Sequence, residues 1–447
     1  MRDLFVFGVV MGTLPLSFRR PFLGLLLFSW LAYMRPQDLC WGFARNMRFS
    51  FYVGFTMVAG WWANERGRVP FTRWDIRTRL LVALALLVGI SYGFAKYQDS
   101  YYTRYLLEFA KIMAVALFTV GQCNSRQRLR WLFWTIALCL GFYGIKGGIF
   151  GVLSGGRPIL RGPGGMLEDN NDFALGLVMN VPLLWYLGLD DRRVPFVRKA
   201  TIAGIGLTAI TILLTHSRGA FLALCSSLLW IAWRSRRIVQ ASMGLLLCVG
   251  MFFAFAPHHV IERLSTIGDT QESSAAARLT AWRTALRMIA DNPILGVGMR
   301  NFQPRYRDYA TGLIEGHSTT YVAHNSYLQI WAESGSIAFA IYLVLLASVF
   351  WTCRRVFRLS ERRPDMPWLA NYSRMMEATT VGFMVGAFFL NRGHFDLIYH
   401  WMALVSALSF VASSAWSRRL VESSGAGAVR VGWRPSPGSA PRWGRLV

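Results

Sequence analysis

The 447-residue sequence has few charged residues and almost no lysine. Charged side chains make up 16% of the chain and hydrophobic ones 54%, whereas about a quarter of the residues of a soluble domain are charged. This composition excludes an ordinary soluble multi-domain protein. Only four of the 48 basic residues are lysine, so arginine, whose planar guanidinium matches phosphate oxygens, carries the positive charge. A net charge of +25 is compatible with nucleic acid or anionic lipid as a partner.

Several motifs are also absent from the sequence. The six cysteines form no C-x-x-C pair and no regular framework, which argues against structural disulfides and zinc fingers. No D-x-D motif occurs, and no nucleotide-binding glycine fingerprint is followed by a lysine. The acidic stretch from Glu168 to Asp172 could bind a cation but has no histidine partner. We therefore predict no metal site and no cofactor.

Long apolar runs separated by short arginine clusters predict an all-α polytopic membrane protein. The apolar segments lie at about 4–17, 21–34, 50–63, 79–95, 107–121, 131–150, 173–189, 200–215, 219–233, 239–256, 326–352, 375–391 and 398–416. The first two are short for a bilayer core of about 30 Å and could form one crossing or a tilted pair. The first segment is expected to be an uncleaved helix. We expect about 12 transmembrane helices, with both chain ends on the same side.

The distribution of the basic residues predicts the orientation of these helices. Basic residues gather in loops at 64–79, 121–130, 190–199, 233–237 and 353–374 and in the tail from 417, which together hold 27 of them. This excess assigns these loops to the cytoplasm. The long segment 257–325 lies on the other side and holds seven arginines that topology does not explain. Function is therefore expected there.

Four regions follow from this pattern. We expect transmembrane helices over 1–256, an outer loop domain with an amphipathic helix over 257–325, further transmembrane helices over 326–416, and a disordered basic cytoplasmic tail over 417–447.

Two short outer turns place arginines where an anion could bind. Arg157 and Arg161 flank a glycine-rich turn; glycines let backbone N–H groups approach an anion, and guanidinium groups match phosphate oxygens. The alternative is a flexible loop that contacts lipid headgroups. Arg218 lies in a tight turn at the start of the next helix, a costly place for a cation unless it meets an anion or a water-filled cavity. His216, in the same turn, is expected to form local hydrogen bonds.

Residues 273–293 predict an amphipathic helix. Its apolar stripe comprises Leu279, Trp282, Leu286 and Ile289. Arg283 and Arg287 point away from the stripe and indicate a solvated face. Arg278 flanks the stripe, which makes it a candidate ligand held against the membrane domain, with snorkelling to the interface as the alternative.

A histidine precedes the long apolar segment that starts near residue 326. Ser326 and Gln329 match a capping box, which places His324 just before a helix N-terminus. The positive helix end disfavours imidazolium, so a neutral His324 is suited to act as a general base. The alternative is that His324 only caps the helix or hydrogen-bonds the loop.

Five further polar residues near this point are secondary candidates. They are His317, Tyr321, Asn325, Glu333 and Arg392. Glu333 lies within an apolar run and needs a partner such as an arginine or a polar cavity, so structural pairing is its favoured role. Arg392 closes another outer turn.

With these residues in view, the chain resembles the O-antigen ligase and polymerase superfamily, and most closely the O-antigen ligases and exosortase-associated O-glycosylation ligases of Gram-negative bacteria. The resemblance extends from about residue 35 to 416. The segments that carry it are Arg161-Gly162-Pro163 with the acidic stretch 168–172, Thr215-His216-Ser217-Arg218-Gly219, Gly296-Val297-Gly298 with Asn301-Phe302, and His324-Asn325-Ser326-Tyr327-Leu328 with Glu333-Ser334-Gly335.

The resemblance implies a glycosyltransferase of the inner membrane with GT-C-like helical architecture and a periplasmic loop. Its implied partners are an undecaprenyl-pyrophosphate-linked glycan donor, a hydroxyl acceptor such as a lipid A core sugar, and the lipid bilayer, without nucleic acid. It further implies metal-independent inverting displacement, with His324 as general base. Pyrophosphate would be held by Arg161, Arg218 and Arg278, and less strongly by Arg157.

Other functions remain open at this point. An O-antigen polymerase or a protein O-glycosylation ligase would use the same donor with another acceptor. A transporter of lipid-linked glycans is expected to carry polar sites at the membrane midplane in two related halves, whereas the polar candidates here gather at the outer surface. A membrane scaffold would need neither the histidine nor the arginines.

Overall fold

The computed structural model describes residues 1–190, 194–235, 243, 250, 273–310, 321–363 and 365–423. The long elements of these ranges are helices. They are α1 (Arg2–Arg19), α2 (Pro21–Tyr33), α3 (Phe49–Gly60), α4 (Ile76–Gly93), α5 (Ser100–Gln122), α6 (Arg126–Leu153), α7 (Asn170–Asp190), α8 (Pro195–Leu214), α9 (Arg218–Ser235), α12 (Ser273–Asp291), α13 (Tyr306–Tyr309), α14 (Ser326–Glu361), α15 (Pro367–Ala387) and α16 (Asp396–Ser423).

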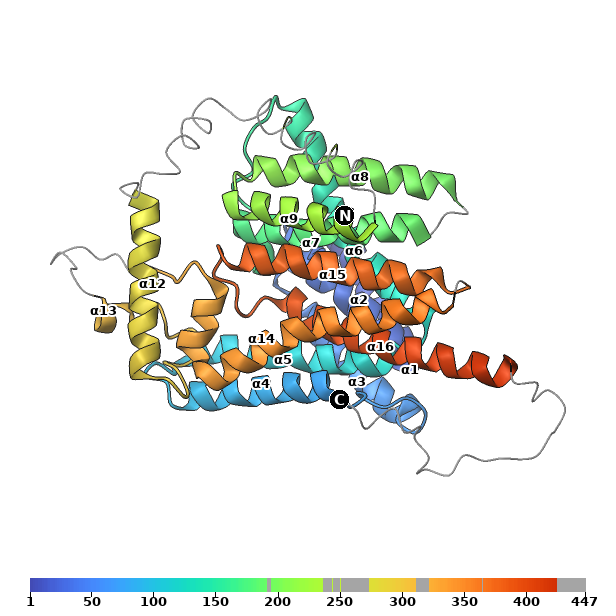
Figure 1. Ribbon diagram of the computed structural model, residues 1–447, viewed down its shortest axis with the longest axis horizontal. Coiled ribbons are helices and arrows are strands. Elements are labelled where there is room, and N and C mark those ends of the chain that lie inside the picture. Colours follow the sequence, from blue (N-terminus) through green and yellow to red (C-terminus); the bar gives the residue numbers. More distant parts are fainter. Residues whose placement is uncertain are drawn as a thin grey trace.

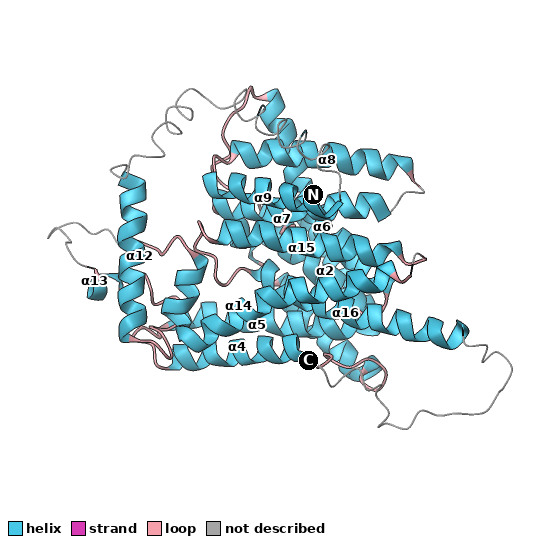
Figure 2. Cartoon of the chain, viewed as in Figure 1, coloured by secondary structure: helices cyan, strands magenta, loops and turns pink. Residues whose placement is uncertain are grey.

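Most of these helices lie side by side in one bundle (Figure 1), and loops join them without a sheet in the described ranges (Figure 2). Helix α12 instead runs across one end of the bundle, at the left of the view. We call this end, with the loops beside α12, the site end. The predicted amphipathic helix is therefore present, and it runs across the ends of the bundle helices.

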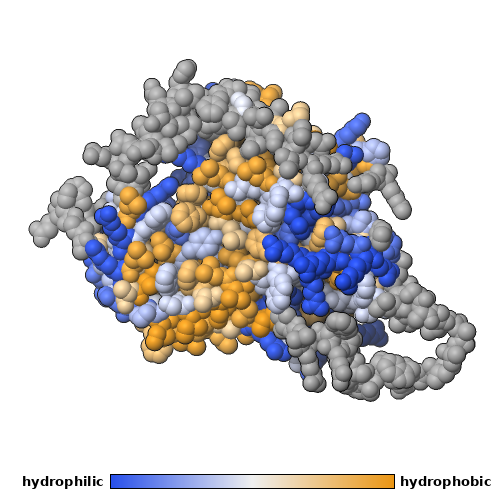
Figure 3. Space-filling model, in the orientation of Figure 1, coloured by the Kyte–Doolittle hydropathy of each residue, from blue (hydrophilic) through white to orange (hydrophobic). Residues whose placement is uncertain are grey.

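Seven of the described helices are long and apolar enough to cross a membrane: α4, α5, α6, α7, α8, α14 and α16. On the face drawn in Figure 3, hydrophobic side chains occupy the middle of the molecule and hydrophilic ones gather toward the two ends of the bundle. The expected total of about 12 is not established by these seven, and the predicted segment 239–256 lies almost wholly outside the described residues. Helices α1 and α2 are separate helices joined at Arg20.

The arginine-rich loops meet at the end of the bundle opposite α12. Gln122 donates a hydrogen bond to Glu65 (3.1 Å), which joins the loop after α3 to the end of α5. Arg126 at the start of α6 pairs with Asp190 at the end of α7 (3.1 Å), and Tyr372 of α15 bonds the same carboxylate (3.3 Å). The loops predicted to share one side of the membrane thus share one end of the bundle.

The C-terminal helix is longer than expected. Helix α16 continues to Ser423, beyond residue 417, where the disordered tail was expected to begin. Residues 424–447, which make up most of that predicted tail, lie outside the described residues.

Helix α14 is interrupted at Gly335, whose backbone has φ 81° and ψ 174°. The chain that follows α12 fills the interruption. Val297 donates its backbone N–H to the carbonyl of Ala332 (2.8 Å), and Gly298 donates to that of Glu333 (2.9 Å). Carbonyl groups released by the broken helix are therefore satisfied by the segment that follows α12.

The buried face of α12 differs from the predicted stripe. Leu279 and Leu286 are 43% and 52% exposed, whereas Ala281, Ala285 and Met288 are fully buried. The prediction of those two leucines as core-facing was wrong because small residues allow the helix to lie close to the chain beneath it, and hydropathy ranks alanine below leucine.

Candidate functional site

The glycine-rich turn after α6 is held against the end of α8. Ile159 donates its N–H to the carbonyl of Leu214 (2.8 Å), and Asn170 donates its side-chain amide to the carbonyl of Thr215 (2.8 Å). Within the turn, Arg161 and Asp169 form an isolated antiparallel bridge. The predicted Arg161 is therefore fixed beside an acidic residue and close to the turn that carries Arg218.

Two glycines of this turn make room for a side chain that the sequence analysis did not select. A Cβ added at Gly165 would collide with the guanidinium of Arg35, and one at Gly164 would meet the carboxylate of Asp38. Arg35 and Asp38 form an ion pair. The two glycines therefore allow the Arg35–Asp38 pair to pack closely against the turn, in addition to any approach of the turn to an anion.

The α8–α9 turn presents Arg218 at the first residue of α9, where its side chain is exposed. His216 has a φ of 54°, in the left-handed region. Gly219 packs on Phe389, the residue before Leu390 in the loop after α15. The predicted arginine therefore lies beside the same loop that supports the start of α14.

The start of α14 differs from the predicted capping box. Asn325 is the N-cap, and its Oδ1 accepts hydrogen bonds from the backbone N–H groups of Tyr327 (3.0 Å) and Leu328 (3.1 Å). Ser326 instead donates to the carbonyl of Leu390 (2.8 Å) and accepts from the N–H of residue 392 (2.9 Å). The capping box was wrong because Asn325 is itself a strong cap and Ser326 has a tertiary partner.

His324 lies directly before this cap, with a φ of 47° and a half-buried side chain. Helix α12 is anchored beside it, since Trp282 donates its indole N–H to the carbonyl of Ala323 (3.0 Å). Arg278 is one turn earlier than Trp282, so both side chains lie on the same face of α12. This contact brings Arg278 toward His324.

The surroundings of His324 favour a neutral imidazole. Burial lowers the pKa of His324, the positive charge of Arg278 lowers it further, and the negative charge of Asp169 partly opposes them. The expected neutral state is thus supported. Its causes are burial and the charge of Arg278, whereas the sequence argument relied on the positive helix end. Three segments meet here: the loop after α6, helix α12 and the start of α14.

Two secondary candidates have identified partners. Arg392 forms an ion pair with Asp172 at the start of α7, and this contact joins the loop before α16 to the acidic stretch. Glu333 is buried and accepts a hydrogen bond from Gln329 (3.3 Å), while His394 Nε2 lies 3.5 Å from the same oxygen. The hydrogen-bond partner of Glu333 is therefore the Gln329 amide, with His394 nearby, and not the arginine that the sequence suggested.

The remaining candidates are less closely connected to His324. Arg157 is exposed, and its backbone N–H donates to Ser154 within its own turn (3.3 Å). Tyr321 packs edge-on against Tyr306, with ring centroids 5.7 Å apart. His317 lies outside the described residues.

No group of three or more His, Cys, Asp or Glu side chains in the described part of the chain could hold a metal ion. In the acidic stretch, Asp169 accepts from the backbone and side chain of Asn171 (2.9 and 3.0 Å). Together with the Asp172–Arg392 pair, this leaves the acidic stretch bonded within the protein. That the protein needs no metal remains a prediction.

Arg300 is a site-end residue that sequence reasoning missed. It has a φ of 62° and its guanidinium carbon lies 4.2 Å from the ring centroid of Tyr105. The closely spaced Gly296 and Gly298 were the available signal in the sequence, because glycine is favoured where a turn needs positive φ. Both residues have positive φ in the structure.

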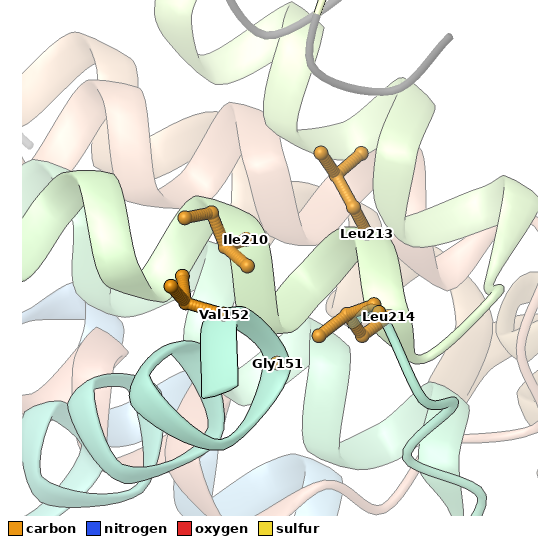
Figure 4. A pocket seen from close by; sticks show the side chains of 6 residues that line it. Gly151, Val152, Ile210, Leu213 and Leu214 are labelled. Carbon is orange, nitrogen blue, oxygen red and sulfur yellow. The ribbon is translucent and has the colours of Figure 1, made fainter. Parts of the chain in front are cut away.

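A small apolar pocket lies between the ends of α6 and α8. It is lined by Gly151, Val152, Gly156, Ile210, Leu213 and Leu214, and Figure 4 shows the aliphatic side chains around it. No charged group lines the pocket, so it offers no catalytic chemistry. Its position next to residue 157 nevertheless puts an apolar surface beside the glycine-rich turn.

The span-length apolar helices and the arginine-bearing site end define a multi-pass helical membrane protein with a polar site at one end. Residues 203–343 match the family model described as O-antigen ligase, and residues 1–187 match one described as a family of unknown function (DUF5935). The first match supports membership of the chain in the O-antigen ligase superfamily. No curated protein matches the chain. Arg218, Arg278 and His324 fall within the first match, and Arg157 and Arg161 within the second.

Proposed function

We propose that this protein is an O-antigen ligase-type glycosyltransferase that moves a glycan from undecaprenyl pyrophosphate to a hydroxyl of a lipid A core sugar. The observation that carries the proposal is the neutral-favouring environment of His324 beside Arg278, at the meeting point of three segments. The superfamily match supports the ligase or polymerase type of activity. The donor, the acceptor and the mechanism are our proposal.

The reaction is a single inverting displacement at the anomeric carbon of the donor glycan. The acceptor hydroxyl oxygen forms the new bond to that carbon as the bond to the pyrophosphate oxygen breaks, and the electron pair of the broken bond leaves with the pyrophosphate. His324 takes the hydroxyl proton on a ring nitrogen. Its depressed pKa supports this role, because a protonated imidazole could not accept the proton.

Arginines are proposed to stabilise the negative charge of the pyrophosphate leaving group. Arg161, Arg218 and Arg278 are proposed to bind the pyrophosphate and to offset the charge that develops as the glycosidic bond breaks. Their placement on the glycine-rich turn, the α8–α9 turn and α12 supports this, because these elements surround the start of α14. Arg157 is a weaker member on an exposed turn.

The donor's lipid needs an apolar surface next to the anion site. The pocket between α6 and α8 is too small to hold a lipid chain, but its apolar lining shows that the surface next to Arg157 is apolar (Figure 4). We propose that the site end faces the periplasm and that the end opposite α12 faces the cytoplasm, with the bundle in the bacterial inner membrane. The gathering of the basic loops at one end supports this orientation.

The test is a transfer assay with the purified full-length protein and undecaprenyl-pyrophosphate-linked glycan. Lipid A core, a second lipid-linked glycan and an acceptor protein are supplied in separate reactions. We expect the glycan on lipid A core with stoichiometric release of undecaprenyl pyrophosphate. Extension of the donor glycan would indicate a polymerase, and glycosylated protein a protein ligase. Donor movement across a vesicle without release of undecaprenyl pyrophosphate would indicate a transporter and overturn the proposal.

A further inference from the structure

Four tyrosines gather at the site end where α4 turns into α5. Tyr101 packs edge-on against Tyr102 and Tyr105, with ring centroids 5.1 and 5.2 Å apart, and Tyr97 lies 6.2 Å from Tyr102. We call these four residues the tyrosine cluster. Tyr105 donates its hydroxyl proton to the oxygen of Tyr101 (3.2 Å). Tyr101 is 60% exposed, so the cluster offers an aromatic face outside the protein core.

The guanidinium of Arg300 covers one ring of this cluster. Its carbon lies 4.2 Å from the centroid of Tyr105, within the range of a cation–π contact. Within the described ranges, no carboxylate lies within ion-pair distance of Arg300. The neighbouring Arg305, by contrast, pairs with Asp308 (3.2 Å).

The protein holds Arg300 in place from both sides. The next residue, Asn301, is fully buried and exchanges two hydrogen bonds with the backbone of Tyr97, at 3.0 and 3.1 Å. Gly298, with a φ of 99°, packs directly on Ala95. Arg300 itself keeps a left-handed φ of 62°. A non-glycine residue persists in that conformation only where its surroundings determine it, so the backbone at Arg300 is set by these contacts.

Arg300 is linked to the start of α14 through the acidic stretch. Arg300 is near enough to Asp172 for the two charges to interact, and Asp172 pairs with Arg392. The backbone N–H of Arg392 bonds Ser326, two residues after His324. In Figure 1, α5 lies along the lower side of the bundle and α9, which begins at Arg218, along the upper side. Helix α5, which carries most of the tyrosine cluster, and helix α9 thus lie on different sides of the bundle.

We infer that Arg300 and the tyrosine cluster form the acceptor subsite and bind a sugar ring that carries an anionic group, such as a phosphate. Aromatic faces pack against the C–H face of a sugar ring, and the guanidinium pairs with the anion. The inference rests on the proposed function, because it assigns a binding site to the second substrate of that reaction. It names a chemical feature of the acceptor that the superfamily match does not.

The experiment measures binding to the full-length protein in detergent by titration calorimetry. Three probes are used: a deacylated, phosphorylated core oligosaccharide, the same oligosaccharide after phosphatase treatment, and the donor glycan without its lipid. Arg300→Gln should weaken binding of the phosphorylated probe about tenfold, and Tyr101→Ser roughly fivefold. Arg305→Gln is the matched control, because that cation is already paired with Asp308; it should bind like the wild type.

Each outcome decides the assignment. The subsite is supported if Arg300→Gln binds the phosphorylated probe more weakly than the wild type does, while both proteins bind the phosphatase-treated probe equally. This result supports the subsite even if the wild type transfers no glycan. Equal binding in Arg300→Gln and wild type overturns the subsite, and the proposed function stands if transfer continues with an unchanged acceptor KM. A tyrosine cluster that serves only as an interfacial aromatic belt would lower the melting temperature of Tyr101→Ser without changing binding. Preference for the donor glycan would overturn the assignment to the acceptor.

Discussion

The two ends of the helix bundle both contain ion-paired arginines but differ in backbone conformation. At the end opposite α12, Arg126 pairs with Asp190, and Arg234 pairs with the buried Glu377 at 2.8 Å. At the site end, all the described non-glycine residues with positive φ occur. They are Arg35, His216, Arg300 and His324, and each is an arginine or a histidine.

Ion pairing alone does not separate the two ends, because Arg35 pairs with Asp38 and Arg392 with Asp172 at the site end as well. Residues in the left-handed region cost about 1–3 kcal/mol each unless the fold compensates, and such residues cluster at functional sites. The described glycines with positive φ also lie in site-end loops or at the break of α14. Backbone conformation therefore distinguishes the site end from the opposite end independently of charge.

The largest effect is expected at His324. His324→Ala should lower the rate of glycan transfer about 1000-fold, because general-base catalysis contributes on the order of 100- to 10,000-fold. Transfer is measured with lipid-linked donor and lipid A core, alongside donor binding and melting temperature, both of which should stay close to wild type. Full transfer by this variant would eliminate the general-base role.

A second comparison tests one arginine from each end. Arg218→Lys keeps the charge but loses the bidentate fork, so we expect transfer to fall about 100-fold. Arg126→Lys at the opposite end is the control and should remain active, since Arg126 pairs with Asp190 and is about half exposed. Unchanged donor affinity and rate in Arg218→Lys would mean that this cation acts as a point charge or has a structural role.

A third comparison concerns the strained backbone. Gly335→Ala should destabilise the protein by about 2 kcal/mol, because φ is 81° there and a Cβ would collide with the carbonyl of Ile294. Gly89→Ala in α4 is the control, since no atom lies within 4 Å of its added Cβ. Alanine there should stabilise the helix slightly. Thermal unfolding in detergent measures both, and equal melting temperatures would contradict the strain at residue 335.

The smallest effects concern pH dependence. Transfer requires neutral His324, so the rate should fall as pH drops through its pKa, which lies below the usual 6.5. Arg278→Gln removes a charge that lowers this pKa, so the acid limb of the pH–rate profile should move to higher pH. Asp169→Asn removes an opposing charge and should move the limb to lower pH. Shifts in the same direction would show that these residues do not act on His324 through their charges.

The sequence predicted the helical bundle and several members of the site end because both depend on local patterns. Long apolar runs identify spans, and an arginine in a tight outer turn is conspicuous, as at Arg218. The neutral state of His324 was also expected. Its main cause, burial with Arg278 nearby, depends on how α12 docks, and no local pattern encodes docking.

What the sequence did not predict depends on contacts between distant segments. The choice of Asn325 over Ser326 as the helix cap follows from the tertiary hydrogen bond of Ser326 to Leu390. The exposure of Leu286 follows from close packing of α12 through alanines. Arg300 was passed over because its role arises only when residues 296–301 meet the turn between α4 and α5.

The interruption of α14 at Gly335 limits how far this protein is modular. The segment that follows α12 supplies backbone donors to Ala332 and Glu333 inside that helix, so neither part satisfies its own polar groups alone. Exchanging this segment between members of the superfamily would therefore require exchanging the first turns of α14 as well. A graft of the segment by itself would leave carbonyl groups without donors.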